Sequence, residues 1–229
     1  MPLPIAVALF AAWLAGSELL REALVSEVLL ERASDPASGT PRWRAALGLY
    51  FQASMLLLLL AYWAVGGFGG DGSKVRRSQW VGGGSEVRRP QGVKLVAYTF
   101  MLIFGGFMLY DFTILSLRPA LALHHVVCLV AHTYVLAVGT DDGGFRWYLA
   151  AVVVLEMGSG ACNLWCVWPN NFTLPIYISV MTASNLGCML LAIRQWAPST
   201  SASEAGKLFA KSTTVLLACI RQLLMHWGR

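Results

Sequence analysis

The sequence predicts an all-α membrane protein, a polytopic transmembrane helical bundle with six or seven spans. Of its 229 residues, 57% are apolar and only 13% are charged, about half the charged fraction of an ordinary soluble domain. The mean hydropathy is +0.60. The apolar residues form long uninterrupted stretches, and a helix needs roughly 20 such residues to cross a bilayer. This composition argues against a soluble globular enzyme and predicts an integral membrane protein.

Seven apolar stretches are candidate spans, at residues 3–20, 45–65, 93–117, 120–138, 146–168, 172–193 and 207–226. The last stretch also carries two lysines, Arg221 and Gln222. It therefore either spans against protein neighbours or lies at the membrane interface, where we expect Arg221 to contact lipid headgroups. The chain then divides into an N-terminal span with an amphipathic segment (1–44) and a transmembrane domain (45–226).

Basic residues cluster beside the apolar spans, and the net charge is +5. The long hydrophilic loop at residues 66–92 is rich in glycine and contains several Lys and Arg residues. We expect this loop to be mobile, to face the cytosol and to contact anionic lipid headgroups. Nucleic acid is a poor match for a chain whose basic groups border the membrane.

Five ionisable side chains fall within the spans, where polar groups are costly and indicate function. They are Asp111, His124, His125, His132 and Glu156. A helix rises about 1.5 Å per residue, so Asp111 and the adjacent histidines lie at similar depths on either side of one turn. Glu156 falls between the levels of His125 and His132. The depths predict one polar cluster in the luminal half or at the midplane of the bundle.

Several chemistries suit such a cluster. A histidine held by a carboxylate can act as a general base or an acyl-accepting nucleophile, as acyl transfer to a lipid requires. Three histidines and a carboxylate are also a ligand set for zinc, as in a membrane amidohydrolase. The third interpretation is structural, because polar residues often fasten membrane helices to one another. Asn163 fits either a packing or a ligand-binding role.

The residues that carry this pattern also resemble a known family. Tyr110-Asp111 is followed thirteen residues later by His124-His125, and Glu156 opens a segment that contains Asn163-Leu164. This arrangement is similar to the TLC domain, which the translocating-chain-associated membrane protein, the ceramide synthases and the ceroid-lipofuscinosis ER cargo protein share. The resemblance covers roughly residues 45–226. It implies a helical bundle around a lipid-accessible cavity, in the endoplasmic reticulum or another endomembrane.

The resemblance also implies roles for individual residues. His124 and His125 match the histidine pair of ceramide synthases, and Glu156 matches the first downstream acid, whereas Ser159 stands where the second acid would be. We therefore expect catalytic roles for His124, His125, Asp111 and Glu156, and positions beside the lipid cavity for His132, Asn163 and Ser159.

The short TLC-domain-containing proteins are the branch that the chain resembles most, because they share Asp111 after Tyr110. The implied function is membrane lipid homeostasis, of sphingolipids or phospholipids. One alternative is acyl-CoA-dependent N-acylation of a sphingoid base, with acyl-CoA as co-substrate and with no metal or other cofactor. Another is a non-catalytic lipid sensor or ER cargo adaptor.

Overall fold

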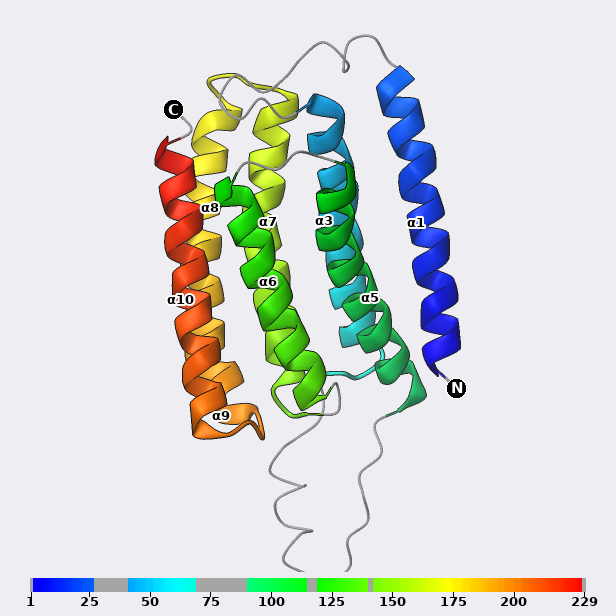
Figure 1. Cartoon of the computed structure of the whole chain (residues 1–229), viewed down its shortest axis with the longest axis vertical. Coiled ribbons are helices and arrows are strands. Elements are labelled where there is room, and N and C mark those ends of the chain that lie inside the picture. Colours follow the sequence, from blue (N-terminus) through cyan, green and yellow to red (C-terminus); the bar gives the residue numbers. More distant parts are fainter. Residues whose placement is uncertain (1, 27–40, 69–89, 115–118, 140–141, 228–229) are drawn as a thin grey trace, which may run out of the picture.

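The computed structural model describes residues 2–26, 41–68, 90–114, 119–139 and 142–227. These residues fold into a bundle of long helices (Figure 1). The long helices are α1 (Pro2–Ser26), α3 (Arg42–Ala64), α5 (Gln91–Ile114), α6 (Pro119–Val138), α7 (Phe145–Val167), α8 (Thr173–Leu191) and α10 (Glu204–Trp227). Most of the predicted 66–92 loop lies outside the described residues.

Six of these helices, all except α10, are long and apolar enough to cross a membrane. Large apolar side chains project outward from them, with Leu57 66% and Leu60 51% exposed on α3 alone. Apolar surface on this scale needs lipid around it. The prediction of an all-α polytopic membrane bundle is confirmed.

Helix α10 is too polar to count as a span by composition, yet it lies lengthwise beside α8 in Figure 1 and packs on α6 and α8. Its 24 residues extend for about 36 Å. Leu217, Ala218 and Arg221 are buried on its inner side. The prediction that Arg221 contacts headgroups is therefore wrong, because this side of α10 faces protein.

Local sequence explains where several helices begin and end. Pro119 opens α6, a position where proline costs no hydrogen bond. The Asn170 side chain accepts hydrogen bonds from the backbone N–H groups of Phe172 and Thr173 at 2.8 and 2.9 Å, which caps α8. α8 continues into a wider π turn, η1 (Ala192–Trp196), and the short α9 (Ala197–Ser199), which contains Pro198.

Aromatic rings fill the core between α1, α3 and α5. The rings of Phe51 and Phe107 stack with centroids 3.9 Å apart, and Trp13 of α1 packs against both. The Trp13 indole also donates a hydrogen bond to Ser54 Oγ at 3.1 Å. This packing fixes the rotation of α3 and α5 about their axes, so it determines which of their side chains face the interior.

Four helix ends that carry polar residues lie on one side of the bundle. α3 and α6 begin there, and α5 and α10 end there, at the upper side of Figure 1. Arg44, Asp111, the histidine pair and Arg221 all lie within two or three turns of these ends. The up-and-down order of the helices thus brings distant parts of the sequence to one level.

Candidate functional site

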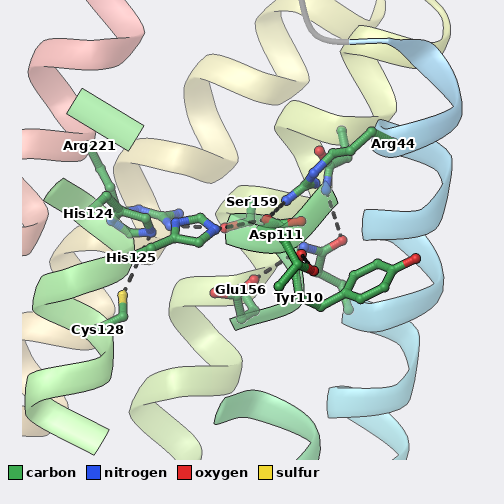
Figure 2. Close-up of polar contacts among 12 residues, drawn as sticks. Arg44, Tyr110, Asp111, His124, His125, Cys128, Glu156, Ser159 and Arg221 are labelled. Atoms are coloured by element: carbon green, nitrogen blue, oxygen red, sulfur yellow. Dashed lines mark hydrogen bonds and ion pairs between the residues drawn. The ribbon is translucent and has the colours of Figure 1, made fainter. Parts of the chain in front are cut away.

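A buried carboxylate lies at the centre of the site. Asp111 of α5 is 0% exposed, and its Oδ2 atom accepts a hydrogen bond from His125 Nε2 of α6 at 2.8 Å. The same oxygen pairs with the Arg44 guanidinium of α3 (Figure 2). Three helices therefore meet at one carboxylate, and the sequence-based pairing of Asp111 with the histidine pair is seen in the structure.

The hydrogen bond to Asp111 fixes which nitrogen of the neutral His125 ring carries the proton. A carboxylate accepts but does not donate, so Nε2 carries a proton, and in the neutral ring the lone pair is on Nδ1. His125 is 3% exposed, and its Nδ1 has no hydrogen-bond partner among the described residues. A buried acceptor without a partner is uncommon in proteins. His125 thus presents a free basic nitrogen inside the bundle.

His124 lies next to His125 and has the same feature. The two ring centroids are 5.6 Å apart, and His124 Nε2 is 3.7 Å from the thiol of Cys128. His124 is 6% exposed, and its Nδ1 also has no partner in the part of the chain that the structure describes. The pair therefore offers two buried ring nitrogens that are open to a further contact.

His132 has separate partners, although it was expected in the same cluster. Its Nε2 donates to the backbone carbonyl of Met101 at 2.9 Å, and its Nδ1 accepts from the hydroxyl of Tyr148 at 2.8 Å. Both ring nitrogens are satisfied, which ties α6 to α5 and α7. His132 thus fastens helices two turns away from His125.

Glu156 and Asn163 of α7 belong to a third group. Glu156 accepts a hydrogen bond from Gln52 Nε2 at 3.2 Å, and Gln52 Oε1 accepts one from Asn163 at 3.1 Å. The chain approaches closely here, because a Cβ at Gly48 would lie 2.2 Å from Asn163 Nδ2. Glu156 is thus bonded to α3 instead of to a histidine, and the single cluster predicted from depth divides into separate groups.

Ser159 of α7 accepts a hydrogen bond from Arg221, the inward-facing cation of α10. The Arg221 guanidinium donates to Ser159 Oγ at 2.9 Å, to Asn185 Oδ1 at 2.9 Å and to the Leu155 carbonyl at 2.8 Å. Arg221 is close enough to His124 for its charge to act on that ring (Figure 2). Ser159 is therefore linked to the histidine pair only indirectly. It bonds Arg221, and Arg221 lies near His124.

Arg44 and Arg221 were missed as site residues. Arg44 precedes the predicted start of its span by one residue, and there an arginine is ordinarily assigned to the headgroup layer. The burial of Arg221, in contrast, could have been predicted from the sequence. Arg221 follows Leu217 by four residues and Ala218 by three, so it continues the stripe that α10 buries.

An apolar cavity adjoins the histidine pair. Its volume is about 80 Å³, and it is partly open to the outside. α6, α7, α10 and η1 form most of its wall, which includes Cys128, Tyr148, Leu155, Trp196, Phe209 and Leu217. Cys128 lines the cavity and also contacts His124. Cys128 is therefore the link between the cavity wall and the histidine pair.

The described residues contain no group of three or more His, Cys, Asp or Glu side chains that could hold a metal ion. Arg44 pairs with the Oδ2 atom of Asp111, whereas Oδ1 has no hydrogen-bond partner among the described residues. The arrangement is that of an oriented histidine beside an apolar chamber, which suits proton transfer to or from a lipid.

Comparisons with known proteins add no relative. No family model matches the chain, and no curated protein and no solved structure matches it. The structure shows a membrane-spanning helical protein with buried histidine, aspartate and arginine side chains. The likeness to the TLC domain stays a prediction from the sequence.

Proposed function

We propose that this chain is a TLC-type protein of the endoplasmic reticulum or another endomembrane that acts in membrane lipid homeostasis by acyl transfer. The observation that carries the proposal is the Asp111–His125 pair with its unpartnered ring nitrogen, beside His124, which contacts Cys128 of the cavity wall. Sphingoid bases and lysophospholipids are the acceptor classes that fit, because each presents an amine or hydroxyl on an apolar chain.

In this proposal His125 is the general base. Its Nδ1 takes the proton from the acceptor amine or hydroxyl while that nitrogen or oxygen attacks the carbonyl carbon of the acyl donor. The new amide or ester forms as the bond to the leaving group breaks, and the proton passes to the leaving group. Asp111 holds the ring in the required tautomer and stabilises the imidazolium. General-base catalysis of this kind contributes about 10²–10⁴-fold.

In this proposal the cavity and His124 position the acyl donor. An acyl chain in the cavity places its carbonyl near Cys128, which touches His124. His124 Nδ1 has no other partner in the described structure, so it is available to the carbonyl or the leaving group. Holding donor and base in one geometry removes much of the entropic part of the barrier.

The test is an acyl-transfer assay with the purified protein in liposomes. Long-chain acyl-CoA is supplied with a sphingoid base or with a lysophospholipid, and the N- or O-acylated product is measured by mass spectrometry. We expect product with the wild type and at least about 100-fold less with His125→Ala. His132→Gln is the matched control. His132 lies on the same helix as His125, and a glutamine can keep both of its hydrogen bonds, to Met101 and to Tyr148. No product with any acceptor, or equal rates for His125→Ala and the wild type, would overturn the proposal.

One observation favours a second candidate, a lipid-binding protein without catalysis. The Arg44–Asp111 ion pair joins α3 to α5, which is also what a structural pair does in a membrane bundle. In that case the protein would bind acyl lipids and release them unchanged in the same assay.

A further inference from the structure

Arg221 is a buried cation whose partners are all neutral. It is 5% exposed, and besides its hydrogen bonds to Asn185, Ser159 and the Leu155 carbonyl it contacts Met181 Sδ at 3.1 Å. Among the residues that the structure describes, no carboxylate lies within 4 Å of this guanidinium. All the hydrogen-bond partners of this guanidinium among the described residues are therefore neutral.

The contrast with the other buried arginine of the site is direct. Arg44 is paired with the carboxylate of Asp111, as buried charges generally are. A guanidinium has five N–H groups, and the four contacts of Arg221 leave one N–H on Nη1 without a partner among the described residues. An anion can therefore add to Arg221 without breaking an existing bond.

The apolar cavity leads to this cation. Leu217 lines the cavity one helical turn before Arg221, and Leu155 both lines it and accepts a hydrogen bond from Arg221. From Phe209 to Leu217 the α10 wall extends for about 12 Å. On the side of Nη2 the guanidinium packs against Gly158, where a Cβ would lie 2.8 Å from this nitrogen. Two residues of the cavity wall, Leu155 and Leu217, thus lie next to this positive charge.

We propose that Arg221 binds the anionic head, a carboxylate or phosphate, of a single-chain acyl lipid whose chain fills this cavity. The apolar wall accepts the chain, and the charge selects an acid over a neutral ester. The inference rests on the proposed function in one respect, that the cavity takes a lipid chain. It adds the class of lipid and the residue that selects it.

The experiment measures binding, with the full-length purified protein in a neutral detergent. The probe is the fluorescent fatty acid cis-parinaric acid, compared with its methyl ester. We expect the wild type to bind the acid at least tenfold more tightly than the ester, and Arg221→Gln to bind both at the level of the ester. Arg194→Gln, which removes an exposed arginine of η1, should behave as the wild type does. Equal affinities of the wild type for acid and ester would overturn the inference, whatever the variants do.

Two further arms locate the chain and the head. Ala210→Phe fills the cavity from α10 and should weaken both probes, whereas Ala205→Phe, on the exposed side of the same helix, should weaken neither. Competition by palmitate or by lysophosphatidate shows whether the carboxylate or the phosphate is preferred, and competition by neither overturns the inference. His125→Ala should bind the acid normally, so acyl transfer and anion binding can fail independently.

Discussion

Replacing Asp111 with asparagine is expected to lower acyl transfer by about 10²–10⁴-fold. An amide in place of Oδ2 no longer fixes the His125 tautomer with Nδ1 unprotonated, and it does not stabilise the imidazolium that forms when the ring takes a proton. The measurement is the initial rate of product formation in liposomes at saturating acyl-CoA, together with the affinity for cis-parinaric acid.

Lipid affinity should change little in Asp111→Asn, because Asp111 does not line the cavity and bonds His125, whereas Cys128 of the cavity wall contacts His124. The result that contradicts a role for Asp111 in catalysis is an unchanged rate in a variant that is folded. Since the substitution also leaves Arg44 without its partner, the double variant Arg44→Gln/Asp111→Asn is the control. It should be as stable as the wild type to within a few kcal/mol and still be inactive.

The second large effect is on stability. Arg44→Gln should lower the free energy of unfolding by about 3–5 kcal/mol, because it leaves the Asp111 carboxylate buried without its cation. The measurement is the thermal unfolding midpoint in detergent. Arg221→Gln is the comparison variant. It should lower the free energy of unfolding by less, since the hydrogen-bond partners of Arg221 are neutral and its removal leaves no contacting charge unpaired.

A double-mutant cycle separates the pair from the individual side chains. If Arg44 and Asp111 stabilise each other, the two single substitutions should cost more in sum than the double variant does. Additive costs would show that the ion pair contributes nothing beyond the separate side chains, which would contradict this assignment.

The spans and the pairing of Asp111 with the histidines were predictable, for a shared reason. Apolar length sets which segments cross the bilayer, and the rise per residue then sets the depth of each polar group. Asp111 and His125 lie close to the same turn between α5 and α6. Their depths are counted from that turn over few residues, so the error in the estimated depths is small. The structure joins them by a hydrogen bond of 2.8 Å.

Depth does not determine the rotation of a helix about its axis, and the remaining errors come from this. His132 lies two turns from His125 on one face, but the packing of Phe104 and Tyr148 around it directs its ring to other partners. Glu156 is at the expected level, yet the rotation of α7 turns it towards Gln52. These rotations depend on side-chain packing between helices, which a single sequence does not specify.

The cavity could not be predicted from composition. Its wall combines residues from α6, α7, α10 and η1, and each of these segments carries apolar residues on its other sides as well. The structure shows which apolar residues surround the cavity, and that Cys128 and Leu155 of its wall contact His124 and Arg221.

The central claim is that an acyl lipid lies in this cavity with its reactive end beside the histidine pair. Photo-crosslinking tests this claim most directly. Two fatty acids are used, one with a diazirine near the carboxyl group and one with a diazirine near the methyl end. We expect the first to label the regions of Cys128 and Leu155 and the second to label those of Trp196 and Phe209, both suppressed by excess palmitate. Identical labelling by the two probes, or labelling that palmitate does not suppress, would contradict the account.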